Sequence, residues 1–265
     1  MAAFSVIALS TFVVVALTPP ALYIITILGN IAFSVAVGFM VRRVVNANYA
    51  LNLPAANKSV FITGCDTGLG YVAAVALHRK GFIVFAGCLD QYSEGALYLK
   101  SSGIIVLHVD YLRPDTIENA YRKICDVLNG VDLWAIVANA GVSSYGEVEW
   151  MKPNELQRLI DVNLVGTLKF VGTGIPQIRR STGRIAIVTG LQGKSEANTI
   201  QGYTIRVASR LSIPGMAVAS ATTAALCQYA DGLRRELRKF GVQVSAIEPA
   251  FYRQVLGTVV TTPPP

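Results

Sequence analysis

Histidine and cysteine are scarce in this 265-residue chain, and neither forms a metal-binding pattern. The two histidines, His78 and His108, lie far apart, and the four cysteines include no CxxC pair. Zinc sites need closely spaced Cys and His ligands, and disulfide frameworks need paired cysteines, so the sequence argues against both. We therefore expect no metal site and read the cysteines as reduced thiols in a core.

Charged side chains are absent from residues 2–41. Pro19 and Pro20 divide this region into an apolar run at 2–17 and a second run at 21–41. The second run has 21 residues, which is enough to cross the roughly 30 Å hydrocarbon core as a helix. The first is short for a span and fits a tilted partner, a re-entrant piece or part of a signal anchor. A cleaved signal peptide is disfavoured, because no basic region comes first and the apolar stretch is too long.

We therefore predict a membrane anchor over residues 1–45, with one or two segments. Arg42 and Arg43 close the second run, so the positive-inside tendency places the following domain in the cytosol. The net charge is +7, and its basic residues lie mostly at expected helix ends and on a polar helix face without interleaved aromatics. This pattern favours a solvated face beside an anionic membrane over a nucleic-acid partner. The residues concerned are Arg179, Arg180, Arg184, Arg206, Arg210, Arg234, Arg235, Arg238 and Lys239.

The rest of the chain alternates short apolar strands with helices. After a polar-leaning linker at 46–57, strands are expected at 59–63, 83–87, 104–110, 133–139, 184–189 and 243–248. Helices are expected at 69–80, 93–99, 114–128, 153 to about 175, and 217–240, the last of these capped by Gly241. This order predicts an α/β fold with a doubly wound, Rossmann-like parallel sheet over residues 58–253, followed by a short irregular tail at 254–265.

A glycine-rich turn joins the first expected strand to the first expected helix. The spacing is Thr-Gly-x-x-x-Gly-x-Gly, in which glycines permit a sharp turn and let a phosphate approach the backbone at a helix N-terminus. This arrangement predicts a dinucleotide pyrophosphate site. Its candidate residues are Gly64, Cys65, Asp66, Thr67, Gly68, Leu69 and Gly70.

Together with Asn139-Ala140-Gly141, Asp161-Val162-Asn163 and Leu233-Arg234-Arg235-Glu236-Leu237, this turn resembles the short-chain dehydrogenase/reductase family over residues about 58 to 253. The sequence around these motifs is similar to that of the family's membrane branch, which holds 3-hydroxybutyrate dehydrogenase type 1, the retinol dehydrogenases and 17β-hydroxysteroid dehydrogenase type 2. The resemblance implies a doubly wound sheet, a nicotinamide dinucleotide and hydride transfer at a hydroxyl or keto group. Dimers through helices 153–175 and 217–240, with a like chain or a related dehydrogenase, would also follow.

The cofactor positions implied by the resemblance are mostly intact. Asp110 matches an adenine-contacting acid, and Asn139, Ala140, Gly141 and Pro249 match positions around the cofactor. The second expected strand ends in Cys88-Leu89-Asp90 with no Arg or Lys for a 2′-phosphate, which favours NAD over NADP. Asp90 either reaches the ribose hydroxyls or caps the next helix.

The catalytic positions depart from the family pattern. The family uses a Tyr, a Lys four residues later and a preceding Ser to handle the substrate proton, and these positions read Ala219, Thr223 and Gly190 here. Asn163 is present, Thr189 stands beside Gly190, and Tyr203 lies in an inserted stretch with Arg206 nearby as a fixed cation. Asn163, Thr189 and Tyr203 are therefore the catalytic candidates. Against Tyr203, Val207 occupies the place of the Lys.

Two interpretations of function remain open. The first is a membrane-anchored, NAD(H)-dependent dehydrogenase of a lipophilic steroid or retinoid substrate, located in the endoplasmic reticulum or, less favoured, in a mitochondrial membrane. The second is a non-catalytic dinucleotide-binding relative or a truncated isoform, since the Ser, Tyr and Lys positions read Gly190, Ala219 and Thr223.

Overall fold

The computed structural model describes residues 20–50, 54–144, 146–189, 212 and 214–249, and these fall into two units that divide after Pro54. In the described part of the first unit lies helix α2 (Pro20–Ala50). The segment Ile24–Val41 of this helix has a mean hydropathy of 2.2, and none of its residues is buried. This segment is the one candidate membrane span among the described residues. The helix continues past Arg43, so the residues of the predicted linker before position 51 are helical.

The second unit contains a six-stranded parallel sheet with the order β3-β2-β1-β4-β5-β6. The prediction of a doubly wound, Rossmann-like sheet is confirmed. The strand order reverses between β1 and β4, which is the point where such folds bind ligands beyond the carboxyl ends of the strands. The strands are β1 (Ser59–Thr63), β2 (Ile83–Cys88), β3 (Ile105–His108), β4 (Ala135–Ala138), β5 (Arg184–Val188) and β6 (Gln243–Ile247).

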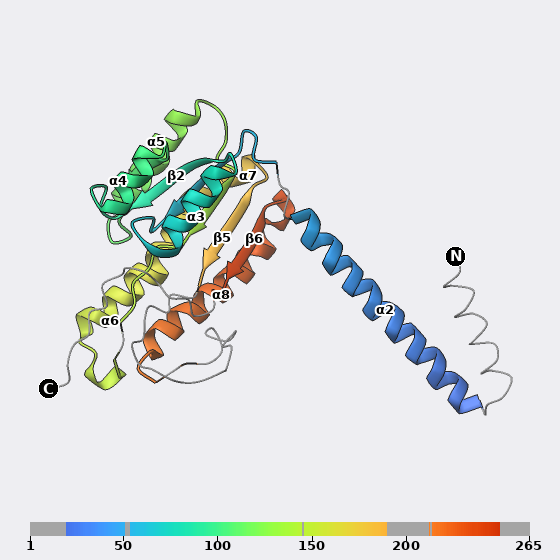
Figure 1. Ribbon diagram of the computed structural model, residues 1–265. Coiled ribbons are helices and arrows are strands. Elements are labelled where there is room, and N and C mark those ends of the chain that lie inside the picture. The colour runs from blue at the N-terminus through green and yellow to red at the C-terminus, as the bar shows by residue number, and fades with distance from the viewer. Residues whose placement is uncertain (1–19, 51–53, 145, 190–211, 213, 250–265) are drawn as a thin grey trace. The chain divides into compact units, whose positions relative to one another are not determined.

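Helices cover both faces of this sheet (Figure 1). They are α3 (Gly68–Arg79), α4 (Glu94–Ser101), α5 (Pro114–Leu128), α6 (Pro153–Ile160), α7 (Thr167–Arg180) and α8 (Ala217–Leu237), with short turns η1 (Val148–Trp150), η2 (Asp161–Gly166) and η3 (Arg238–Phe240). Successive side chains of a strand point to opposite faces, and β1 shows this directly. Phe61 packs with residues of α5, α7 and α8, whereas Val60 and Ile62 pack with residues of α3 and α4.

A cluster of aromatic rings fills the core under α5 and α7. Phe61 meets Tyr121 and Phe170 edge-on, with ring centroids 5.3 and 5.1 Å apart. The Tyr121 hydroxyl donates to the Phe170 carbonyl at 3.0 Å, so its polar end is satisfied within the apolar core. Buried aromatic groups of this size dominate the stability of a domain core.

The long helix expected at 153–175 is instead α6 and α7 joined by the π-helical turn η2. Gly166 ends this turn, and a Cβ there would lie 2.5 Å from the Cβ of Tyr111, so the helix passes close to the loop after β3. The helix expected at 217–240 is α8 followed by η3, and Gly241 closes it with a left-handed φ of +71°, which confirms the predicted cap.

Candidate functional site

The turn after β1 lies at the carboxyl edge of the sheet, where the strand order reverses. Gly64 and Gly68 have φ angles of +68° and +62°, a region that favours glycine. A Cβ on Gly70 would lie 2.2 Å from the Gly64 carbonyl oxygen and 2.6 Å from Asn139 Nδ2. The three glycines therefore bring the start of α3 directly against the turn and the end of β4.

This cradle fits the pyrophosphate of a dinucleotide. The first amides of a helix have no helical acceptor and favour an anion, and glycines leave the backbone open to one. Thr67 is the exposed N-cap of α3 and makes no side-chain cap bond, while Leu69 is half-buried in the first turn. Thr67 and Leu69 thus lie at the start of α3, and their contact with a cofactor stays a prediction.

Thr63, at the end of β1, holds β4 in register with the turn. Its hydroxyl oxygen accepts hydrogen bonds from the amides of Asn139 (3.1 Å) and Ala140 (3.2 Å). The Asn139 side chain in turn donates to the carbonyls of Thr63 (2.9 Å) and Gly64 (3.3 Å). Asn139 thus stabilises the glycine turn, and Gly141 lies exposed just beyond it. Sequence reasoning missed Thr63, although it directly precedes Gly64.

The Thr63 hydroxyl also contacts the Tyr111 hydroxyl at 2.8 Å. Burial raises the pKa of Tyr111, and the hydrogen bonds from Thr63 and Thr167 lower it in part. Just before Tyr111, Asp110 accepts a bond from the Leu112 amide at 2.9 Å and shapes the turn after β3. Asp110 therefore lies just after the carboxyl end of β3, and its predicted contact with an adenine stays a prediction.

Asp66 links the glycine turn to the loop after β2. Its carboxylate accepts hydrogen bonds from the amides of Leu89 (3.0 Å) and Asp90 (2.9 Å). Asp90 in turn accepts from the Tyr92 amide at 2.8 Å, so it orders this loop, whereas the cap of α4 is Ser93, whose hydroxyl accepts from the Ala96 amide. Lys100 Nζ donates to the Gln91 carbonyl at 3.1 Å, so α4 brings a cation to this loop that the strand-end sequence did not reveal.

Cys65 and Cys88 are turned into the core. Both have 0% exposure, the Cys65 thiol donates to the Ile62 carbonyl, and the Cys65 amide donates to Gly87. Burial raises the pKa of Cys65 and raises that of Cys88 to about 12. Both thiols pack in the cluster under α3 and α4, Cys88 at the end of a strand that is buried on both faces and Cys65 in the turn after β1, and their predicted contact with a cofactor stays a prediction.

Asn163 lies in η2 with 3% exposure. Its Oδ1 accepts a bond from the Val142 amide and its Nδ2 donates to the Val142 carbonyl, both at 2.8 Å. This two-sided pair fixes the loop that follows Gly141. The structure gives the Asn163 side chain a positioning role, and its part in a proton relay stays a prediction.

The remaining catalytic positions carry no acid or base within the described residues. The Thr189 hydroxyl donates to the Ile247 carbonyl at 3.3 Å, and Thr223 donates to Ala219 of its own helix at 3.0 Å. Ala219 is buried in the first turns of α8. Gly190 and Tyr203 lie outside the described residues, and Pro249 lies half-buried beyond the end of β6.

An apolar groove with a volume of about 410 Å³ runs between α6, η2 and the start of α8. It lies on the two helices for which the sequence predicted a dimer contact, and that contact stays a prediction. Its lining consists of Leu156, Ile160, Leu164, Ala217, Val218, Ala221 and Thr222.

Comparison with known proteins shows the family to which this fold belongs. Residues 58–260 match the family described as short chain dehydrogenase. This chain belongs to the short-chain dehydrogenase family. It is 32% identical over 203 residues to bovine mitochondrial D-beta-hydroxybutyrate dehydrogenase, 31% over 204 residues to mouse retinol dehydrogenase 5, and 31% over 211 residues to human 17-beta-hydroxysteroid dehydrogenase type 2.

These matches cover 74%, 76% and 78% of this short-chain dehydrogenase, but 54%, 59% and 50% of the respective relatives. The chain thus spans little more than half the length of the curated relatives it matches. Among solved structures, a short chain dehydrogenase from Burkholderia cenocepacia in complex with NADP has a TM-score of 0.63 at 21% identity, covering 74% of this chain and 75% of that one. A Streptomyces avermitilis short-chain dehydrogenase has the same TM-score at 22% identity, with 74% and 67% covered. Both show the shared fold.

Proposed function

We propose that this short-chain dehydrogenase is a membrane-anchored protein that binds NAD(H) and serves the oxidation or reduction of a hydroxyl or keto group on a lipophilic steroid or retinoid. The observation that carries the proposal is the glycine cradle, in which Gly70 packs against the Gly64 carbonyl and Asn139. The relatives named for hydroxybutyrate, retinol and 17-beta-hydroxysteroids support the class of reaction.

Within this proposal, the amides at the start of α3 hold the pyrophosphate, and Asn139 and Thr63 keep the turn in shape. Asp110 borders the adenine, and Asn163 orders the loop after Gly141. When bound, the nicotinamide supplies hydride transfer. Burial of the domain's apolar groups against the sheet gives this edge the rigidity that positioning requires.

NAD is favoured over NADP by two carboxylates at the loop after β2. Asp66 accepts a hydrogen bond from the Asp90 amide, and Asp90 accepts one from the Tyr92 amide, so both carboxylates lie at this loop. Their negative charge opposes the binding of a 2′-phosphate. Lys100 is a cation near this loop, but its ammonium group bonds to Gln91 and lies 5.5 Å from the Tyr92 ring centroid. We therefore expect tighter binding of NADH than of NADPH.

A second candidate function is dinucleotide binding without turnover, as a sensor or as a partner of an active dehydrogenase. The methyl group of Ala219 cannot transfer a proton, and Thr223 uses its hydroxyl on its own helix. Under this alternative the cradle persists while the proton-handling groups are gone. Tyr203 is the residue that would restore chemistry in the first candidate.

The membrane part of the proposal is supported by Ile24–Val41, with Arg42 and Arg43 directly after it. These two arginines favour a cytosolic domain. The endoplasmic reticulum is the proposed membrane, with a mitochondrial membrane as the alternative, and the groove between α6 and α8 is the proposed dimer contact, with a second copy or a related dehydrogenase.

The test is an NADH titration of the full chain in lipid nanodiscs, followed by steroid, retinoid and 3-hydroxybutyrate substrates with NAD on the same preparation. Binding with turnover that Tyr203→Phe abolishes supports the dehydrogenase. Binding without turnover on any substrate supports the second candidate. A folded chain that binds neither NADH nor NADPH contradicts both.

A further inference from the structure

Cations and aromatic rings meet at the amino ends of the strands, on the side of the sheet opposite the glycine cradle. Lys58 Nζ lies 4.8 Å from the centroid of the Trp134 ring, and the Arg184 guanidinium lies 5.3 Å from the same centroid. At the end of α7, the Arg179 guanidinium lies 3.6 Å from the centroid of Phe240, and Lys239 lies 5.2 Å from it. We call these four cations and two rings the basic edge.

All six residues of the basic edge border the amino ends of the strands. Lys58, Trp134 and Arg184 adjoin the starts of β1, β4 and β5, and backbone bonds from Arg184 to Trp134 and from Trp134 to Ser59 hold these starts together. Dinucleotides bind beyond the carboxyl ends of such sheets. The basic edge therefore lies away from the cofactor phosphates and needs another anionic partner.

Helix dipoles do not explain the whole basic edge. Arg179 lies in the last turn of α7 and Lys239 lies in η3, and a cation is favourable at such helix carboxyl ends. Lys58 and Arg184 instead stand at strand starts, where no helix ends. Within the described residues none of the four cations has a carboxylate partner, whereas neighbouring Arg180 pairs with Asp132 at 2.7 Å.

We infer that the basic edge binds the anionic phospholipid headgroups of the membrane in which α2 is anchored. Two exposed cations, Arg179 and Lys239, and two half-buried ones, Lys58 and Arg184, lie beside half-buried rings. This combination matches the composition of a membrane–water interface, where Trp lies at headgroup level and each Lys or Arg gains about 1 kcal/mol from an anionic surface. A nucleic acid fits less well, because Trp134 already stacks on Phe82 and offers no free platform for a base.

The connection along the chain favours this partner as well. Only residues 51–57 separate the last residue of α2 from Lys58. A short connection raises the effective concentration of the basic edge at the headgroups to the millimolar range, so weak attraction suffices. This inference rests on the membrane anchorage proposed above and adds a second, charge-dependent contact to it.

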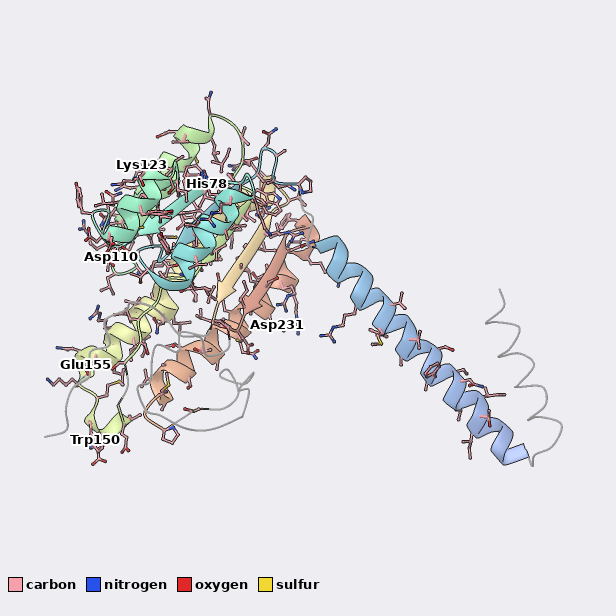
Figure 2. All side chains as sticks on the ribbon, viewed as in Figure 1. His78, Asp110, Lys123, Trp150, Glu155 and Asp231 are labelled. Atoms are coloured by element: carbon pink, nitrogen blue, oxygen red, sulfur yellow. The ribbon has the colours of Figure 1, made fainter. Side chains whose placement is uncertain are left out.

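The two tryptophans of the chain make the inference testable. Trp150, in η1, lies at the end of the domain toward which the strand arrows of Figure 1 point, as Figure 2 shows, whereas Trp134 belongs to the basic edge. In Trp150→Phe the fluorescence reports on Trp134 alone. The full chain is placed in nanodiscs that carry a headgroup spin label, with phosphatidylcholine alone or with about 30% phosphatidylserine.

We expect stronger quenching of Trp134 in the phosphatidylserine discs, reversed in about 1 M salt, where screening shortens the Debye length to about 3 Å. Neutralising Arg179, Arg184 and Lys239 to Gln should lower the equilibrium constant for the quenched state roughly fivefold per cation. The matched control neutralises Lys123, Lys152 and Arg158 to Gln, with the same loss of charge, and should leave quenching unchanged. Thermal melts check that both triple variants fold.

Trp134→Phe, which reports on Trp150, should show no dependence on phosphatidylserine. Quenching of Trp134 that is equal in both lipids overturns the inference, as does a short RNA that binds the basic edge more tightly than the phosphatidylserine surface does. A chain that enters discs but shows no lipid dependence contradicts this inference alone. A chain that fails to enter discs contradicts the proposed anchor and this inference together.

Discussion

At the scale of single residues, the site depends on positions where one methyl group decides whether the turn can form. Gly64 and Gly70 illustrate this, because the backbone of one occupies the space that a side chain on the other would need. This close approach of backbone to backbone adds to the hydrogen bonds that Asp66 and Asn139 make around the turn. A rigid, open backbone is what binding an anion at a helix start requires.

Gly70→Ala should therefore abolish NADH binding, or weaken it by more than about tenfold, and lower the melting temperature, because its Cβ meets backbone that cannot move aside. Gly172→Ala is the matched control, since that exposed helical glycine has nothing within 4 Å. It should bind NADH normally and gain about 0.5–1 kcal/mol from helix propensity. Nicotinamide fluorescence and thermal melts measure both effects, and unchanged binding in Gly70→Ala contradicts the proposed cradle.

Asp90→Asn tests the choice of cofactor while keeping the oxygen that accepts from Tyr92. Removing one negative charge near a 2′-phosphate changes the free energy of binding by about 1 kcal/mol. The ratio of the NADPH to the NADH dissociation constant should fall roughly fivefold, measured by titrating both cofactors. Asp115→Asn removes the same charge from an exposed side chain in the first turn of α5 and should leave the ratio unchanged.

Tyr111 predicts how stability depends on pH. Burial raises its folded-state pKa above the ordinary value of 10.0, so the native state keeps a proton that the unfolded chain loses above about pH 10. The stabilising effect is complete below that pH and is lost as pH rises, at about 1.4 kcal/mol per pH unit for this group. In urea unfolding from pH 9 to 11, the free energy of unfolding should decline less steeply for Tyr111→Phe than for the unmodified chain. Identical slopes in the two proteins would contradict a raised pKa at Tyr111.

The residue scale also shows what sequence could and could not predict. Gly64, Gly68 and Gly70 were predictable because a local spacing between a strand and a helix carries the signal. The two hydrogen bonds that the amides of Leu89 and Asp90 donate to Asp66 were not predictable, since they join segments that only the parallel sheet brings together.

At the scale of elements, α8 is a helix of the expected length with altered chemistry at its start. Its core-facing residues form a regular stripe that includes Ala219, Thr222 and Leu226, which explains why its position was predictable from periodicity. The π-helical turn before α7 was not predictable in this way. It ends at Gly166, which passes close to Tyr111, and that contact joins segments that are distant in the sequence.

The double variant Ala219→Tyr with Thr223→Lys should create turnover, if the start of α8 occupies the place that the family uses for proton transfer. General acid–base catalysis contributes about 10²–10⁴-fold, so NADH formation from a steroid or retinoid alcohol should rise by at least 10²-fold over the unmodified chain. The control is Ala219→Phe with Thr223→Lys, which adds the same bulk without the hydroxyl. Equal rates in the two variants, with NADH binding intact, would contradict this placement of the site.

At the scale of the whole molecule, charge is sorted along the direction of the strands. Asp66, Asp90 and Asp110 adjoin the carboxyl ends of the strands, while Lys58 and Arg184 adjoin the amino ends. The composition shows only a net positive charge, because the separation of acidic from basic residues depends on how six strands align in parallel. The same alignment separates the proposed cofactor site from the proposed membrane contact.

The anchor yields the last prediction. Ile31 and Val35 lie within Ile24–Val41, the segment proposed to cross the bilayer, and a lysine near the centre of a spanning helix costs about 2.5–3.5 kcal/mol. The chain with Ile31→Lys and Val35→Lys should therefore leave microsomes in an alkaline carbonate wash, whereas the unmodified chain should stay in the membrane pellet. Val72→Lys with Leu97→Lys places the same charges at exposed positions of the folded domain and should remain in the pellet.

Glycosylation acceptors added at either terminus then report the orientation of the chain. Modification at the N-terminus alone agrees with a cytosolic domain. Modification at the C-terminus contradicts it, because Arg42 and Arg43 would then lie on the lumenal side.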